Sequence, residues 1–264
     1  DLHSFPTRRS SDLVGVMSSR LKYPSFITRV TAGQGGESLL IEGDQAMALY
    51  DCGMAYCADQ TVQNIRNALH GRKLEYILAS HTHYDHIGGL PYVRKEWPDA
   101  EVCGAAHGQK VLRRSGARKV MQELGMAAEL QYGQGDPSRI ITDGLEITRV
   151  IGEGDVIDLG CRQIHIMDAT GHTADSLVYC IEPEHILISS ETTGVLLRPG
   201  VAHTATLKSH EGVMRTLAKC RAYHAAMVIC PHYGVIPEEE IGAYWDLIDR
   251  KSTRLNSSHG RRSR

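Results

Sequence analysis

One short segment, residues 80–89, constrains this chain more than any other feature of its sequence. It reads SHTHYDHIGG. Four potential metal ligands lie within six of its residues: His81, His83, Asp85 and His86. The apolar run at residues 74–79 predicts a buried strand that ends just before this segment. Because alternate side chains of an extended backbone point to one side, the first two histidines are expected to face the same space.

The second half of the segment indicates a tight turn. Asp85 and His86 reach the same space only if the backbone turns sharply after His83, and Gly88 and Gly89 give the backbone that freedom. Imidazole and carboxylate groups together suit zinc, iron or manganese. A polar loop that merely contains several histidines is the alternative. The spacing between a strand and two glycines favours the metal site.

Short strands and helices alternate along the rest of the chain. Strand-like runs lie at residues 26–31, 37–42, 45–50, 74–79, 145–151, 156–159, 163–169, 176–181, 185–189 and 226–230. Helical patterns lie at residues 58–69, 90–97, 105–131 with a break near Gly116, 208–223 and 237–248. There is no fixed short repeat and no low-complexity linker. One layered domain therefore fits this pattern better than two domains.

The two ends of the chain differ from its middle. Residues 1–13 and 249–259 have neither helical nor strand periodicity, and both resemble direct translations of sequencing-library adapter DNA. We therefore expect residues 1–13 and 249–264 to be artefacts that flank a single domain at residues 14–248. That domain has a net charge of −7, because residues 249–264 contribute +5 and residues 1–13 contribute zero to the total of −2. Such an acidic body disfavours a nucleic-acid partner.

Cysteine usage and apolar runs bear on the cellular compartment. The seven cysteines include no CxxC pair, which indicates reduced thiols. Met17 is the expected start, and no apolar segment of a secretory signal follows it. No apolar run approaches the roughly 18 to 20 residues that span a bilayer. We expect a cytoplasmic protein with no membrane partner, and the sequence leaves its oligomeric state open.

Four further motifs follow predicted strands. They are Asp51-Cys52-Gly53, Gly171-His172-Thr173, Glu191 and Pro231-His232-Tyr233-Gly234. Together with the histidine-rich segment, these motifs resemble in order and spacing those of the metallo-β-lactamase fold superfamily. The resemblance extends over residues 26–248. It implies an α+β fold, a four-layer αββα sandwich, with the metal site at one edge between two sheets.

The resemblance also implies ligands for two divalent metal ions. One ion would be held by His81, His83 and His172, and the other by Asp85, His86 and His232. Glu191 would bridge them, although the family usually has an aspartate there, and the longer side chain would change the metal spacing or bind one metal only. Zn²⁺ is the expected metal, with iron and manganese as alternatives. Asp51 is expected to orient a ligand histidine or a metal-bound water.

The activity implied by the resemblance is that of a metal-dependent hydrolase. Two ions lower the pKa of a shared water, and the bridging hydroxide attacks an electrophilic carbonyl or phosphorus. Asp85 is the expected catalytic residue, because it would orient the hydroxide and help pass on its proton. A small-molecule substrate is expected, and an ester, thioester or lactone is the leading class.

Three alternatives stay open: a phosphodiesterase of the same fold, an iron-dependent redox enzyme and a non-catalytic metal-binding sensor. Diiron oxygen reductases of this fold replace the second histidine with Glu, so His83 argues against them. His203, in the long loop after Glu191, is a candidate for substrate contact. Tyr84 is a candidate for the mouth of the site. Cys52 has no evident base partner and is regarded as a bystander.

Overall fold

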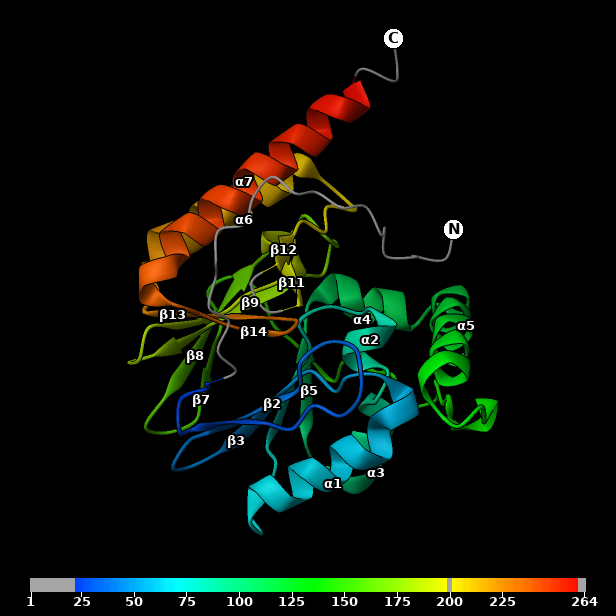
Figure 1. Cartoon of the computed structure of the whole chain (residues 1–264). Helices are drawn as coiled ribbons and strands as arrows, with labels where there is room; N and C mark the ends of the chain where they lie inside the picture. The colour runs from blue at the N-terminus through cyan, green and yellow to red at the C-terminus, as the bar shows by residue number, and fades with distance from the viewer. Residues whose placement is uncertain (1–21, 199–200, 261–264) are drawn as a thin grey trace.

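The structure is a computed structural model that describes residues 22–198 and 201–260 (Figure 1). Its helices are α1 Ala58–Leu69, α2 Tyr84–Ile87, α3 Leu90–Glu96, α4 Ala106–Leu112, α5 Ser115–Tyr132, α6 His210–Tyr223 and α7 Glu238–Gly260. Three short 3₁₀ helices are η1 Ala55–Cys57, η2 Pro137–Arg139 and η3 Glu191–Thr193. No helix among these described residues has both the length and the apolar character that crossing a membrane requires.

The first sheet has six strands in chain order from β1 to β6. They are β1 Ile27–Arg29, β2 Leu39–Glu42, β3 Met47–Tyr50, β4 Tyr76–Leu78, β5 Glu101–Gly104 and β6 Arg149–Val150. The first three strands are antiparallel, and β3 to β6 are parallel. Tyr50 pairs with Leu78 at the ends of β3 and β4, so the residues that follow these two strands lie at the same edge of the sheet.

The second sheet also has six strands, in the order β14-β13-β10-β9-β8-β7. They are β7 Val156–Asp158, β8 Gln163–Asp168, β9 Leu177–Glu182, β10 Ile186–Ile188, β13 Met227–Cys230 and β14 Gly234–Pro237. Strand β9 is antiparallel to both β8 and β10, and β10 is parallel to β13. Strands β8, β10 and β13 therefore end at one edge. A separate hairpin consists of β11 Val195–Arg198 and β12 Val201–His203.

Alternating apolar side chains explain why the two sheets stack between helices. In β2, Leu39 and Ile41 pack into the core between the sheets with residues such as Tyr179, whereas Leu40 packs on the other face with Ile65 of α1. In the same way, Val178 of β9 packs outward against α6 and α7. Side chains with a period of two can bury both faces of a strand only between two apolar layers.

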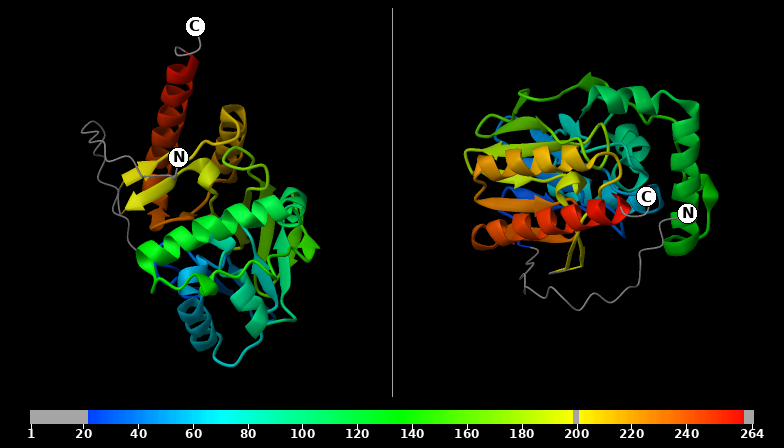
Figure 2. Two further views of the ribbon diagram at one scale, coloured as in Figure 1. Left: turned by 90° about the vertical axis from the view of Figure 1, so that its right-hand side faces the viewer. Right: turned by 90° about the horizontal axis from the view of Figure 1, so that it is seen from above.

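Two helical layers complete the sandwich. Helices α1 and α3 cover the outer face of the first sheet, and α6 and α7 cover that of the second (Figure 1). In the view from above, α6 and α7 run side by side (Figure 2). The expected four-layer αββα architecture is confirmed. The metal-binding motifs lie at one edge of the two central layers, where β4, β8, β10 and β13 end.

Several predicted boundaries differ from the structure. The helix expected at residues 237–248 continues to Gly260. Lys251 donates a hydrogen bond from Nζ to the carbonyl of Ala202 over 2.8 Å, and Ser252 is buried. Residues 249–260, which the sequence pattern set apart from the domain, thus continue α7, and Lys251 contacts β12. Their adapter origin stays a prediction, and residues 1–13 and 261–264 lie outside the described residues.

Candidate metal centre

All seven predicted ligands come from loops or helices that follow strand ends. His81 and His83 follow β4, and Asp85 and His86 lie in α2 directly after them. The other three ligands follow β8, β10 and β13, and they are His172, Glu191 and His232. Because these strands end at one edge of the sandwich, residues up to 151 positions apart in the sequence meet there.

The ligand atoms form two groups that match the two predicted metal sets. The first group is His81, His83 and His172. The second is Asp85, His86, Glu191 and His232. Within each group every ligand atom lies within 4.8 Å of every other one. A tetrahedral ion with ligand distances near 2 Å holds its donors about 3.3 Å apart, which falls within this limit.

Glu191 lies between the two groups. Its Oε1 is 2.8 Å from Nε2 of His86 and 2.7 Å from Nε2 of His232, both of the second group. Its Oε2 is 3.0 Å from Nε2 of His172, in the first group. One carboxylate therefore contacts both groups with separate oxygens. A bridging ligand would require such contacts with both groups, and the additional methylene of glutamate does not prevent them.

The donor set fits divalent cations. Nε2 of His81 is buried and has no hydrogen-bond partner, although its ring faces those of His83 and His172. Nε2 of His86 and Nε2 of His232 lie 3.2 Å apart, a distance at which two neutral imidazole nitrogens can share only one proton. Burying an unpaired polar atom such as Nε2 of His81 is costly. A cation in each group would give His81 a partner and relieve the crowding of His86 and His232.

Contacts behind the ligands fix the orientation of their rings. Asp51 Oδ2 is 2.8 Å from Nδ1 of His86 and also accepts a hydrogen bond from the Ser80 hydroxyl, which directs Nε2 of His86 toward Glu191. Nδ1 of His172 is 2.5 Å from the carbonyl of Ala205. These contacts place the N–H on Nδ1 and leave the Nε2 lone pair for a metal. Asp51 therefore has the contact expected of a residue that orients a ligand histidine.

The pKa values of His86 and Glu191 are strongly shifted, because several titratable groups lie close together in the site. Burial opposes the charged form of His86, but Asp85, Asp51 and Glu191 outweigh it and raise the pKa of His86 well above its ordinary value. Burial likewise opposes the charge on Glu191, yet hydrogen bonds from His172 and other ring nitrogens hold the pKa of Glu191 well below its ordinary value. The Glu191 carboxylate is thus ionised, and protons on histidines occupy positions that cations would take.

Asp85 and His232 are the ligands of the second group nearest to solvent. Their side chains are 19% and 14% exposed, whereas the His86 side chain is fully buried. Asp85 Oδ2 lies 3.6 Å from Nε2 of His86 and 3.7 Å from Nε2 of His232. The Asp85 carboxylate therefore lies at the mouth of the site, where a water and a substrate can reach it.

Two positioning residues were not recognised in the sequence. Gly36 packs against the His86 ring so closely that an added Cβ would lie 2.6 Å from Nδ1. Asp175 is buried and accepts a hydrogen bond from the backbone N–H of Thr82, between the first two histidine ligands. The glycine-rich stretch at residues 33–36 is the sequence feature that could have indicated the role of Gly36. Nothing in the sequence alone distinguished the second from an ordinary loop aspartate.

Two other expectations concern residues near the site. His203 lies in β12 and is in neither ligand group. Burial and the nearby Lys251 lower the pKa of His203, so α7 rather than the metal centre shapes its surroundings. Cys52 is completely buried, and burial followed by the charge of Asp51 raises its pKa well above the ordinary value. A thiol in that state is a poor nucleophile, as a bystander should be.

A family model for the metallo-β-lactamase superfamily matches residues 33–232, which include all seven ligand positions. The chain belongs to the metallo-β-lactamase superfamily. A solved structure of a metallo-β-lactamase superfamily protein, ST1585 from Sulfolobus tokodaii, superposes with a TM-score of 0.63 at 17% sequence identity. The match covers 85% of this chain and 84% of that one. This match supports the fold of the chain. At 17% identity it does not bear on the substrate.

Curated relatives within the superfamily match over shorter lengths. Hydroxyacylglutathione hydrolase of Synechococcus sp. (strain CC9902) is 31% identical over 112 residues, which cover 42% of this chain and 32% of the relative. Atrochrysone carboxyl ACP thioesterase of Aspergillus fumigatus is 22% identical over 223 residues, which cover 84% of this chain and 55% of that protein. The chain thus spans about a third to about half of the length of these relatives.

Proposed function

We propose that this chain is a metal-dependent hydrolase that binds two divalent ions, most simply Zn²⁺, and cleaves a small thioester, ester or lactone. The observation that carries the proposal is the meeting of His81, His83 and His172 with Asp85, His86 and His232 around one shared carboxylate, Glu191. A non-catalytic sensor would have no need of a partly exposed carboxylate such as Asp85 at the mouth of such a site.

Most of these residues would hold the metal ions, and Asp85 would also move a proton. Two divalent ions held here would lower the pKa of water toward neutral and polarise the substrate carbonyl oxygen. Asp85 would hold an ion through Oδ2, which faces the second group, and its Oδ1 accepts a proton from the attacking water and later delivers it to the leaving group. Asp51 keeps the Nδ1 proton of His86 in place, so that the ring nitrogen facing the site remains a ligand.

Among the candidate substrates, thioesters are the first choice. Two of the relatives bear the names hydroxyacylglutathione hydrolase and ACP thioesterase, and both names describe thioester cleavage. A thioester carbonyl is also more electrophilic than that of an alkyl ester. A cytoplasmic location is part of the proposal, supported by seven free cysteines, five of which are buried.

The experiment is a substrate panel on the purified chain loaded with Zn²⁺, Fe²⁺ or Mn²⁺ in turn. The panel contains a thioester, a lactone, a phosphodiester and a β-lactam. We expect the thioester to be hydrolysed fastest and chelation to abolish the activity. Asp85→Asn should lower kcat much more than it changes KM, since the carboxylate acts on the reacting water. A phosphodiester as the best substrate would refute the carbonyl assignment.

A further inference from the structure

Three tyrosine side chains lie near the metal centre. Tyr84 lies between ligands His83 and Asp85, and Tyr233 directly follows ligand His232, with ring centroids of the latter pair 6.2 Å apart. Tyr132, the last residue of α5, packs on Tyr56, which belongs to the same small cluster as Tyr84. We call these three tyrosines, Tyr84, Tyr132 and Tyr233, the tyrosine rim. They come from three different elements, and none of them is a metal ligand.

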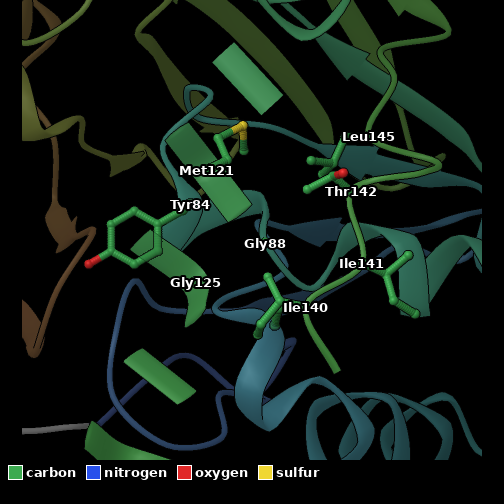
Figure 3. A pocket seen from close by; sticks show the side chains of 9 residues that line it. Tyr84, Gly88, Met121, Gly125, Ile140, Ile141, Thr142 and Leu145 are labelled. Atoms are coloured by element: carbon green, nitrogen blue, oxygen red, sulfur yellow. The ribbon is translucent and has the colours of Figure 1, made fainter. Parts of the chain in front are cut away.

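An apolar base supports the rim. Met54, Tyr56 and Ala128 form a small buried cluster against which Tyr84 packs. The Tyr132 ring lies 6.0 Å from that of Tyr56, and 46% of Tyr132 is exposed. Figure 3 shows the Tyr84 ring beside a small apolar cavity of about 10 Å³ near α5, with its hydroxyl end pointing away from the other residues that line the cavity.

Tyr233 is held in an unfavourable backbone conformation. Its φ is 58°, in the left-handed region that bulky side chains rarely adopt. Its hydroxyl donates a hydrogen bond of 2.7 Å to Oε1 of Gln34, whose own N–H donates to the hydroxyl of Tyr56. Such a conformation persists only where the surroundings enforce it, and it is frequent at ligand-binding sites. The loop at residues 33–36 thus fixes the Tyr233 ring beside the metal centre.

The chemistry of the rim favours an uncharged, flat group. The Tyr233 hydroxyl is already hydrogen-bonded to Gln34. The faces and edges of the Tyr233 ring are therefore the parts left for a ligand to contact. Arg29, whose charge reaches Tyr233, is paired with the buried Glu37 carboxylate over 2.6 Å. A free carboxylate on a substrate would therefore compete with Glu37 for that cation. Aromatic rings bind other aromatic groups through edge-to-face and offset contacts.

We propose that the tyrosine rim binds an aromatic group next to the scissile bond, so that the preferred substrate is an aryl or arylalkyl thioester and not an acylglutathione. This inference rests on the proposed hydrolase function and deepens it. The rim residues act as specificity-determining residues. The metal ligands act on the carbonyl, and the rim holds the group beside it.

The test compares three thioesters on the Zn²⁺-loaded chain: phenylacetyl-N-acetylcysteamine, acetyl-N-acetylcysteamine and a hydroxyacylglutathione. We expect kcat/KM to be highest for the phenylacetyl compound. Tyr132→Ala should lower the phenylacetyl-to-acetyl ratio of kcat/KM by about three- to tenfold, mainly through KM. Tyr132→Phe, which keeps the ring, should preserve the ratio. Leu130→Ala removes an apolar side chain that is 69% exposed on the same helix, and it should leave the ratio unchanged.

Calorimetry with the non-hydrolysable thioether analogue of the phenylacetyl compound separates the two hypotheses. If none of the three thioesters is cleaved but the analogue binds the unmodified chain more tightly than Tyr132→Ala, the hydrolase proposal fails and the rim stands. Equal binding of the analogue to both proteins, or a phenylacetyl-to-acetyl ratio that Tyr132→Ala leaves unchanged, overturns the rim. A higher kcat/KM for the acylglutathione than for the phenylacetyl compound also overturns the rim.

Discussion

Glu191 shows how a single side chain links two clusters of ligands. The sequence predicted it as a bridge but left open whether a glutamate would reach both metals. Its two oxygens contact His86 and His232 on one side and His172 on the other. The position is set by the short helix η3, in which the hydroxyl of Ser190 accepts a hydrogen bond from the N–H of Thr192. The backbone of η3 thus places the carboxylate between the two groups.

Replacing Glu191 tests this bridge. Glu191→Ala should lose about one metal equivalent, from the group of Asp85, His86 and His232, because three imidazoles alone can hold a zinc ion in the other group. Glu191→Asp should keep both metals if the longer arm is only tolerated. Glu211→Ala removes an exposed carboxylate from α6 and serves as the control. Plasma emission spectroscopy measures the metal content, and full retention of both metals in Glu191→Ala would remove Glu191 from the ligand set.

Gly36 is a second residue whose identity the site requires. An added methyl group would lie 2.6 Å from the His86 ring, and that ring cannot move because it is buried and bonded to Asp51. Gly36→Ala should therefore weaken the metal group that contains His86 and lose about one equivalent of metal. Gly116→Ala, at a position with open space around it, should change nothing. Equal metal content in both variants would show that the ring adapts.

The pKa shifts predict how metal binding depends on pH. In the metal-free protein the pKa values of His86 and His172 are raised, so both rings hold a proton up to a higher pH than a free histidine does. A metal must displace these protons, and its apparent affinity should fall as pH falls. Titration of the metal-free chain with Zn²⁺ in two buffers of different ionisation enthalpy should show release of about one to two protons near pH 7. An absence of proton release would contradict these protonation states.

At the scale of elements, the local sequence pattern predicted those helices and strands that interactions between neighbouring residues determine. Helix α1 begins and ends as its periodicity and Gly71 indicated. Strands β5 and β14 and the four-residue helix α2 were not predicted. β5 and β14 are short and are defined by pairing with β4 and β13, and α2 by hydrogen bonds from His86 and Ile87 to the carbonyl of His83. A short strand that is defined by its pairing partner, or a helical turn too short to show a period, leaves no periodic pattern in the local sequence.

The extension of α7 beyond residue 248 makes a prediction at this scale. Removing residues 249–264 deletes the Lys251 contact to Ala202 and the buried Ser252. One hydrogen bond contributes about 1 kcal/mol, which shifts Tm by roughly 2–4 °C in a domain of this size. We therefore expect a slightly lower Tm by calorimetry with unchanged metal content. Lys251→Ala should reproduce most of the shift, and a large loss of metal on truncation would show that the end of α7 supports the site.

At the scale of the whole molecule, the order of five motifs along the chain predicted the architecture. Each motif follows a strand, and the structure places those strand ends at one edge of two stacked sheets. The ligand residues were therefore available from sequence. The tyrosine rim was not, because Tyr132 reaches it only through the packing of α5 on α2 and η1. No local spacing relates this residue to the histidine motifs.

The metal content of the chain tests the central claim most directly. After reconstitution with Zn²⁺ and removal of excess metal, we expect about two equivalents per chain, as two complete ligand sets require. His83→Ala and His232→Ala each damage one set, so each should retain about one equivalent while the fold persists. A chain that binds no zinc, or variants that both keep two equivalents, would contradict the account of the site.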